Sequence, residues 1–379
     1  MIHLESVELR ELRLPLREPF RISSGVCTER RIFLLSLRDV DGVEVWAECV
    51  AGEQPNYGPE TVDTAWHAIR EWLVPRLLGR ALAHPRELHA VLAHNVRGHS
   101  MAKAALEMGA WALHAQREGV PLATALGGTR DRVPTGISIG IQGSPDALVA
   151  RATRALADGY RKIKVKIQPG ADVGYVRAVR EALGASVQIM ADANSAYTLA
   201  DVEHLALLDD LDLLMIEQPL GRDDLRRHAE LQRRLRTPVC LDESIGDLDR
   251  CEDMIALGAG RIVNIKPGRV GGFTESIAIH DLCAAAGIPV WCGGMLESGI
   301  GRAYNVALAS LPNFSLPGDL SPSARYWERD IVEPEWTMDA EGMVRVPRER
   351  PGIGVTPDLG RIDALTVRTE RLEAAGVHV

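Results

Sequence analysis

The sequence predicts an α/β protein in which a parallel (β/α) barrel follows an α+β domain. From about residue 134 onward, short apolar runs alternate with amphipathic segments of helical periodicity. Five consecutive runs end in a charged residue, and these residues are separated by 26, 25, 25 and 24 positions. Units of that length suit one strand, one helix and two short loops. No GxGxxG motif follows the first run, so an open dinucleotide-binding sheet lacks its fingerprint.

Residues 1–125 are predicted to form the α+β domain, because strand patterns come first and helix patterns follow. Alternation of apolar and polar residues predicts three strands, and helical spacing then predicts two helices. The five elements are expected at 7–16, 30–39, 43–50, 61–78 and 99–116.

The barrel is predicted to occupy residues 126–320. Its strands are expected at seven apolar runs, 134–140, 162–167, 187–192, 211–217, 238–242, 261–266 and 289–293. A short eighth strand is expected at 314–318. Residues 321–379 are rich in proline, glycine and charge, so they are predicted to be irregular and to pack back on the first domain.

The composition is that of a soluble globular protein, with 46% hydrophobic and 25% charged residues. No stretch approaches the roughly 20 apolar residues of a membrane helix. No signal peptide is visible, so we expect a cytoplasmic protein. A net charge of -9 without a basic stripe argues against a nucleic-acid partner. The cysteines are scattered without a CxxC motif, which predicts reduced, mostly buried thiols rather than disulfides or a zinc site.

The charged residues at the ends of five strands are the candidates for catalysis. In a (β/α) barrel the carboxyl ends of the strands meet at one mouth, where charged residues are typically catalytic. Each run is apolar until its last position, so scattered surface charge explains the set poorly, although any one member alone could be a solvated strand end. The set consists of Lys166, Asp192, Glu217, Asp242 and Lys266.

The three acids predict a site for a divalent cation. Carboxylates brought together raise each other's pKa unless positive charge lies among them. Oxygen ligands without histidine or cysteine favour a hard ion, and three protein ligands that leave positions open suit Mg²⁺, with Mn²⁺ as a substitute. Neighbouring polar residues are expected to support the site, namely Asn194, Gln218 and Glu243.

Lysines are predicted on both sides of this cation. Lys166 and Lys266 belong to the second and sixth barrel units, so they should face each other across a bound substrate. Near a cation and partly desolvated, an ammonium pKa is expected to fall from about 10.4 toward roughly 7 to 8, where the amine can act as a general base. A substrate carboxylate held by the cation would then lose its α-proton to give a metal-stabilised enediolate.

Lys164 alternates with Lys166 and points into the same interior, one layer deeper. It is expected to pair with a ligand carboxylate and to lower the pKa of Lys166. A paired core lysine without chemistry is the alternative.

The motifs around these residues are KxK at 164–166, DANSAYT, IEQPL, LDESI, NIKPGRVGG and WCGGMLESGIGRA. Together they resemble the enolase superfamily, and specifically its muconate-lactonizing-enzyme subgroup. The nearest likeness is the branch that contains o-succinylbenzoate synthase and N-acylamino acid racemase, and it covers nearly the whole chain. The resemblance implies a (β/α)7β barrel with an α+β capping domain formed by the N-terminal segment and the C-terminal tail. It also implies a homo-oligomer, either a dimer or an octamer.

The resemblance makes Lys166 and Lys266 the acid/base pair and the three acids the metal ligands. It implies that mobile loops of the cap close over the mouth, and ordinary cap packing is the alternative for their aromatic residues. The glycine-rich segment 293–299 offers backbone donors, although a tight turn would need its glycines anyway. The residues expected to contact substrate are Phe20, Ser23, Ser24, Tyr57, Ser138, Gly294, Met295 and Leu296.

Two absences help to choose within the superfamily. Mandelate racemase-like members use a His–Asp pair on the later strands, whereas here the sixth run ends in Lys266 and the seventh has no histidine. Dipeptide epimerases carry Asp-x-Asp near the last strand, and this chain offers only Asp319, so the substrate is expected to lack a free amine there. Arg269 resembles the pattern of the racemase branch, and its guanidinium is expected to favour a neutral Lys266.

The expected function is Mg²⁺-dependent syn-dehydration of a cyclohexadiene carboxylate to o-succinylbenzoate in menaquinone synthesis, racemisation of N-succinyl or other N-acyl amino acids, or both. Both reactions begin with the same α-proton, so the catalytic residues do not separate them. Another epimerase or cycloisomerase of the subgroup, acting on a carboxylate, is the alternative.

Two further classes fit the sequence less well. A Schiff-base aldolase would need one nucleophilic lysine and no acids. A non-catalytic scaffold would tolerate loss of the charged set, which is intact. The expected partner is a small-molecule carboxylate, not a nucleic acid or a membrane.

Overall fold

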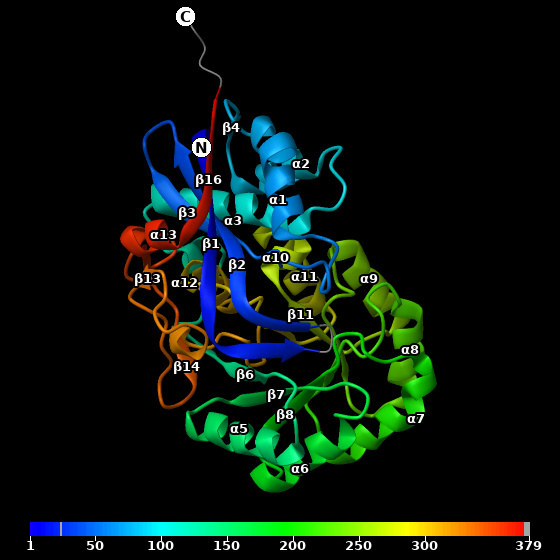
Figure 1. Ribbon diagram of the computed structural model, residues 1–379. Helices are drawn as coiled ribbons and strands as arrows, with labels where there is room; N and C mark the ends of the chain where they lie inside the picture. Colours follow the sequence, from blue (N-terminus) through cyan, green and yellow to red (C-terminus); the bar gives the residue numbers. More distant parts are fainter. Residues whose placement is uncertain (23–24, 375–379) are drawn as a thin grey trace, which may run out of the picture.

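Seven parallel strands form one curled sheet in the lower half of the molecule (Figure 1). The computed structural model describes residues 1–22 and 25–374. The strands lie side by side in chain order, and each is largely buried, as expected for a parallel sheet covered on both faces. The seven predicted strands are confirmed as β6 Gly136–Ile139, β7 Lys162–Lys166, β8 Gln188–Asp192, β9 Ile216–Glu217, β10 Val239–Leu241, β11 Ile262–Ile265 and β12 Val290–Cys292.

Helices cover the outer face of this sheet (Figure 1). Several begin at a side chain that accepts a hydrogen bond from the first turn, as Ser144 does for α5 and Asp247 for α9. Such caps fix the residue at which each helix begins. They therefore also limit where the preceding strand of the same βα unit ends. The main helices are α5 Pro145–Ala157, α6 Val173–Leu183, α7 Val202–Leu205, α8 Leu225–Arg234, α9 Leu248–Leu257, α10 Pro267–Val270, α11 Phe273–Ala285 and α12 Gly299–Ala309.

The segment that closes the barrel is not the regular eighth strand predicted at 314–318. Instead Gly318 bridges the two edges of the sheet: Gly136 N donates to Gly318 O at 2.7 Å, and Gly318 N donates to Pro134 O at 3.0 Å. On the other side Asp319 N donates to Cys292 O at 2.8 Å. Pro317 has no N–H to give to a ladder, which accounts for the loss of a regular strand here.

The upper lobe is an antiparallel sheet packed against helices, with the strand order β16-β1-β2-β3. Its three N-terminal strands are confirmed where the alternation predicts them. The predicted helix over 61–78 is divided into an α-helical, a π-helical and a 3-10 piece, the last of which contains Pro75. The elements are β1 Ile2–Ile22, β2 Gly25–Asp39, β3 Glu44–Cys49, α1 Val62–Ala68, α2 Pro85–Ala93 and α3 Ser100–Arg117.

The C-terminal segment contributes a strand that the sequence prediction missed. β16, Thr366–Glu373, pairs antiparallel with β1, so residues predicted to be irregular complete the sheet of the first domain. The run VRTERLE alternates as a strand does, but proline and glycine upstream dominate the composition of the segment. The predicted return of the tail to the first domain is correct, and its predicted irregularity is wrong for these residues.

A long hairpin of β1 and β2 reaches from the upper lobe down to the barrel (Figure 1). Near its tip, Arg21 O accepts a hydrogen bond from Ile141 N in the loop after β6, at 3.0 Å. A Cβ atom on Gly140 would lie 2.7 Å from that same oxygen, so glycine permits this close approach. The hairpin thereby brings residues such as Phe20 to the barrel mouth.

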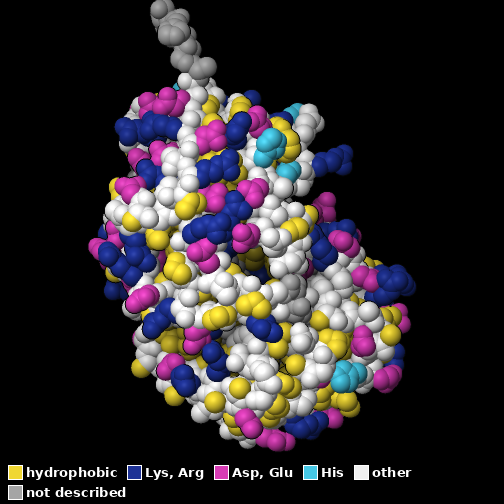
Figure 2. Space-filling view, viewed as in Figure 1, with side chains coloured by type: hydrophobic (Ala, Val, Ile, Leu, Met, Phe, Trp, Pro, Cys, Tyr) yellow, Lys and Arg dark blue, Asp and Glu magenta, His cyan; other side chains and the backbone are white. Residues whose placement is uncertain are grey.

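Most cysteines are buried, as predicted, and only Cys27 is half-exposed. All six are free thiols. Among the described residues, no helix is long and apolar enough to cross a membrane. On the face shown in Figure 2, acidic and basic side chains are interspersed over both lobes rather than gathered in a basic stripe.

Candidate active site

The parallel register brings the five charged strand ends to one mouth. Lys166 on β7 pairs with Asp192 on β8, and Asp192 pairs with Glu217 on β9. Asp242 follows β10 directly, and Lys266 follows β11. All five side chains are buried. The structure therefore brings together the residues that the spacing of the sequence singles out.

Lys166 lies between an acid and an amide. Its Nζ is 2.5 Å from Asp192 Oδ2 and 2.6 Å from Asn194 Oδ1. Asn194 also donates to Glu243 Oε1 at 3.1 Å, so two of the three predicted supporting residues join the network. The strand itself ends at Asp192, and Asn194 adopts a left-handed φ of 42° that turns its side chain toward the lysine.

Lys266 lies on the opposite side of the acids. Its Nζ is 2.8 Å from Asp242 Oδ2 and 3.2 Å from Tyr57 Oη. Burial lowers the pKa of Lys266, but the Asp242 carboxylate outweighs burial and raises the pKa above its ordinary value. The expected fall of this pKa applied to a lysine beside a bound cation, so it stays a prediction.

Arg269 reaches the same carboxylate as Lys266. Its Nη1 bonds Asp242 Oδ1, and its Nε donates to Ile245 O at 2.9 Å. Arg269 and Lys266 therefore share one acid, and the effect of the guanidinium on the protonation of Lys266 stays a prediction.

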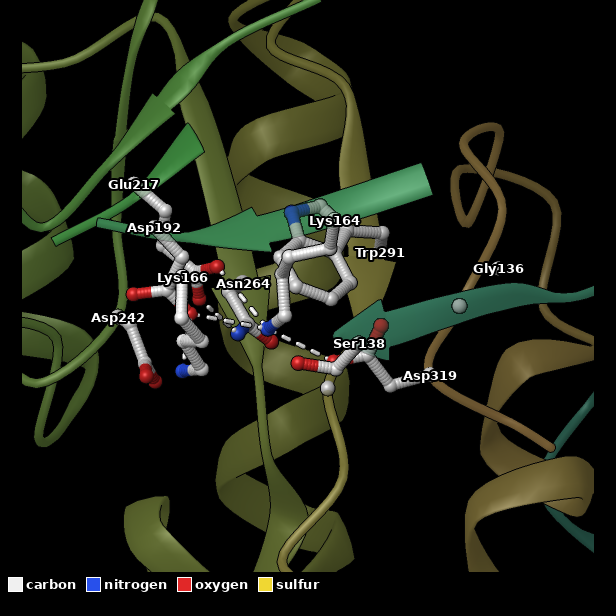
Figure 3. A network of polar contacts seen from close by, with 12 residues as sticks. Gly136, Ser138, Lys164, Lys166, Asp192, Glu217, Asp242, Asn264, Trp291 and Asp319 are labelled. Atoms are coloured by element: carbon white, nitrogen blue, oxygen red, sulfur yellow. Dashed lines mark hydrogen bonds and ion pairs between the residues drawn. The ribbon is translucent and has the colours of Figure 1, made fainter. Parts of the chain in front are cut away.

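Lys164 lies between Asp192 and Glu217 on one side and Asp319 on the other, as Figure 3 shows. Its Nζ is 3.1 Å from both Asp192 Oδ2 and Glu217 Oε2, and 2.7 Å from Asp319 Oδ2. Burial alone would lower the pKa of Lys164, but the three carboxylates raise it well above its ordinary value. The expected pairing of Lys164 with a ligand carboxylate is confirmed, and the contact with Asp319 is new.

Of the three predicted metal ligands, Glu217 contacts the fewest cationic side chains, because Lys164 is its one ion-pair partner among the described residues. Burial and the neighbouring Asp192 raise the pKa of Glu217 to about 7. Its Oε1 accepts a hydrogen bond at 2.7 Å from Asn264 Nδ2, a residue that the sequence analysis did not single out. Asn264 lies two residues before Lys266 and so shares its face of β11, which was the available signal.

Gln218 supports the backbone rather than the charges. Its Oε1 accepts hydrogen bonds from Asp242 N at 3.0 Å and from Ser244 N at 3.2 Å. The side chain therefore fixes the chain at the end of β10, where the third acid is presented.

The donor set fits a hard cation. Burial and Asp192 raise the pKa of Glu217 to about 7, so Glu217 readily holds a proton. Positive charge beyond that of Lys164 and Lys166 is therefore favourable there, and a divalent cation would supply it. In residues 1–22 and 25–374 no three His, Cys, Asp or Glu side chains converge as metal ligands. The reason is that Asp242 faces Lys266 and Arg269 instead, so it would exchange these partners when a cation binds.

A pocket of about 430 Å³ lies above the charges, between the hairpin and the barrel mouth. Lys166 and Lys266 both line it, in agreement with their predicted positions. The predicted contacts Phe20, Tyr57, Gly294, Met295 and Leu296 also line it, together with Ile22, Asn194 and Met101.

One predicted contact residue, Ser138, is placed differently. Ser138 is buried in β6 in register with Lys164, one layer below the pocket, and it is not part of the described wall. Ser23 and Ser24 lie outside the described residues.

Comparison with known families gives two matches along the chain. Residues 5–127 match the N-terminal domain of mandelate racemase and muconate lactonizing enzyme, and residues 147–361 match the enolase C-terminal domain-like family. The chain is 51% identical over 365 residues to an o-succinylbenzoate synthase from Geobacillus kaustophilus, covering 96% of each chain. It is 48% identical to an N-succinylamino acid racemase from Amycolatopsis, covering 96% of this chain and 97% of the relative.

Solved structures show the same fold. A member of the enolase superfamily from Listeria innocua superimposes with a TM-score of 0.95 at 38% identity, covering 99% of this chain and all of the other. Muconate lactonizing enzyme from Pseudomonas fluorescens superimposes with a TM-score of 0.91 at 25% identity, covering 96% of this chain and 99% of the other.

Proposed function

Because the chain belongs to the mandelate racemase and muconate lactonizing enzyme family of the enolase superfamily, we propose that it removes the α-proton of small carboxylate substrates. The observation that carries this proposal is the pocket in which Lys166 and Lys266 face one space above three buried acids. Two amines on opposite sides of a carbon atom can deliver or remove a proton from either face.

Two reactions follow from this arrangement, and relatives with both names support them. The first is dehydration of a cyclohexadiene carboxylate to o-succinylbenzoate, in which Lys166 takes the α-proton and then returns a proton to the departing hydroxide. Lys266 stays cationic in this reaction, which agrees with its raised pKa. The second is racemisation of N-succinyl amino acids, in which each lysine serves one enantiomer.

We propose Mg²⁺ as the cofactor, held by Asp192, Glu217 and Asp242. When bound, such an ion binds the substrate carboxylate and stabilises the negative charge that develops on it as the proton leaves. Lys164 remains beneath the acids and keeps the site from repelling an anionic substrate.

Hydrogen exchange tests the proposal with one substrate pair. N-succinyl-L-phenylalanine and its D-enantiomer are incubated with enzyme and Mg²⁺ in D₂O, and loss of the α-proton signal is followed by NMR. The wild type should exchange both enantiomers, whereas Lys166→Ala and Lys266→Ala should each exchange only one. Lys103→Ala, outside the barrel, is the matched control. Exchange of both enantiomers by both variants would refute the assigned roles.

Metal removal separates this proposal from an imine mechanism. Treatment with EDTA should abolish both exchange and o-succinylbenzoate formation, and Mg²⁺ should restore them. A Schiff-base enzyme would instead keep its activity and be inactivated by borohydride in the presence of substrate.

A further inference from the structure

Lysine is unusually distributed in this protein. The chain has five lysines, Lys103, Lys162, Lys164, Lys166 and Lys266. The last four are all buried in the barrel. Lys164, Lys166 and Lys266 contact the acids of the mouth, whereas Lys162 lies one layer below Lys164 on β7 and has no part in the mechanism above.

Lys162 is fully buried in an apolar environment. Its Nζ lies 3.6 Å from the ring centroid of Trp291 on β12, and among the described residues it donates no hydrogen bond. The Trp291 ring belongs to a small apolar cluster in the barrel, in which its Nε1 donates to Cys240 Sγ at 3.3 Å. A cation in such a place costs free energy, which cation–π contact and an ion pair offset.

The partner of Lys162 is the acid that also holds Lys164. Asp319 Oδ1 lies 3.8 Å from Lys162 Nζ. Asp319 Oδ2 lies 2.7 Å from Lys164 Nζ, and Figure 3 shows Asp319 and Lys164. Oδ1 accepts no hydrogen bond within the described part of the chain. Each oxygen of one carboxylate therefore faces a different lysine, and this fixes the rotation of the carboxylate.

The neighbouring strand leaves room for this arrangement. Gly136 on β6 pairs in register with Lys162, and a Cβ atom at position 136 would lie 2.6 Å from Lys162 Cε. Burial lowers the pKa of Lys162 to about 8, so the amine is mostly protonated at neutral pH. The charge needed for the ion pair is thus present.

We propose that Lys162 is a positioning residue: by holding one oxygen of Asp319, it directs the other oxygen to Lys164, and Lys164 in turn orients Asp192 and Glu217. Without the charge of Lys162, Asp319 can rotate and draw Lys164 away from the two acids. The inference deepens the proposed function, because it concerns the same acids.

The test uses Lys162→Met, which keeps an unbranched side chain over Trp291 and removes the charge. We expect kcat for α-proton exchange of N-succinyl-phenylalanine to fall by about tenfold to a hundredfold, as for other residues that orient metal ligands. KM should change less than about twofold, because Lys162 does not line the substrate pocket. Lys103→Met is the matched control and should leave both constants unchanged.

A second readout needs no substrate. Protein labelled with ¹³C at the lysine ε-carbon gives five side-chain signals, one for each lysine. In Lys162→Met the Lys164 signal should move while the Lys103 signal stays. Asp319→Asn, which removes the charge but keeps the size, should move the Lys164 signal in the same way. Because Asp319 itself contacts Lys164, it is Lys162→Leu, which also removes the charge, that decides the question if Lys162→Met does not fold.

The two readouts separate the possible failures. If the Lys164 signal stays unmoved in the folded variants, or kcat is unchanged, Lys162 only fills space and the inference is wrong. If the signal moves but the wild type exchanges no N-succinyl amino acid and forms no o-succinylbenzoate, the proposed function fails while the positioning role stands.

Discussion

The barrel mouth and the seam between the two lobes both bury carboxylates, and they neutralise them in different ways. At the barrel mouth, Asp192 and Asp242 pair with ammonium and guanidinium groups. At the seam between the two lobes, Glu48 and Glu107 instead accept hydrogen bonds from the first turns of barrel helices. The seam, defined by these two residues, contains acids that are as deeply buried as those of the mouth.

The seam acids cap helices that belong to the other lobe. Glu107 on α3 accepts from Phe273 N at 2.7 Å and Thr274 N at 3.0 Å, at the start of α11. Glu48 on β3 accepts from Ser298 N and Gly301 N, both at 3.1 Å, at the start of α12. Backbone donors at a helix N-terminus suit an anion and cannot move without the helix.

The difference lies in which partner can move. A backbone N–H is fixed by the fold, so a carboxylate that it binds serves stability. An ammonium group on a flexible side chain can turn toward a substrate or give up its proton, so a carboxylate that it binds can take part in chemistry. Burial of acids alone therefore does not mark a catalytic site in this protein.

The largest expected effect tests the mouth. Lys166→Ala should lower kcat/KM for o-succinylbenzoate formation by about a thousandfold or more, because general acid–base groups contribute about 10² to 10⁴. Its free energy of unfolding should change by less than about 1 kcal/mol, measured by urea denaturation. If the variant lost stability together with activity, Lys166 would serve stability as the seam acids do, and the difference between the two regions would be refuted.

The pH dependence of stability tests the seam. Burial, partly opposed by the bonds from Ser298, raises the pKa of Glu48 from 4.5 to about 8. The folded state therefore keeps a proton that the unfolded state has released, and this contribution to stability is full below about pH 4.5 and lost as pH rises to about 8.

Glu48→Gln, which cannot ionise, should flatten this dependence. Between pH 5 and 8 the free energy of unfolding of the wild type should fall relative to Glu48→Gln by up to about 1.4 kcal/mol per pH unit. Urea denaturation at several pH values measures both proteins. Equal slopes would show that Glu48 is ionised in the folded state throughout.

Removal of the other seam acid should cost stability rather than activity. Glu107→Ala leaves buried donors of Phe273, Thr274 and Trp111 without an acceptor. We expect the free energy of unfolding to fall by about 3 kcal/mol, since each unsatisfied buried group costs about 1–3 kcal/mol. At 25 °C kcat should stay within about twofold of the wild type, while the exposed control Glu118→Ala should alter neither quantity.

The smallest expected effect separates the two proposed reactions. Arg269→Met would leave Lys266 as the cation that contacts Asp242, beside the hydrogen bond from Tyr57, and raise the pKa of that lysine further. Racemisation requires a neutral Lys266 in one direction, whereas dehydration requires it cationic. We therefore expect racemisation to lose about tenfold more activity than dehydration, equivalent to about 1.4 kcal/mol. Parallel losses in the two assays would show that Arg269 acts only on the shared acid.

The strands of the barrel and the charged residues at their ends could be predicted from the sequence. In a parallel barrel, repeat length alone places Lys166, Asp192 and Glu217 side by side, because each unit contributes one strand end to the same mouth. The same logic explains why Asn264 could have been found, as it alternates with Lys266. The pattern of apolar and polar residues does not predict irregular structure, such as the bridge at Gly318 that replaces the expected eighth strand.

Features set by pairing across the chain could not be predicted in this way. The raised pKa of Lys266 depends on the contact between its ammonium group and Asp242, which the spacing of residues does not encode. Asp319 meets Lys162 and Lys164 only because the closing segment passes beneath the acids. The role of Glu48 likewise depends on how the two lobes pack.

The placement of the lysines also determines how the protein meets reagents that acylate primary amines. Four of its five ε-amines are enclosed by the barrel, and the basic side chains elsewhere are almost all arginine, which such reagents leave intact. Lys103 and the N-terminal amine, both in the upper lobe, are the groups through which the protein could be coupled to an activated support. Coupled molecules would then share one orientation, with the barrel directed away from the surface.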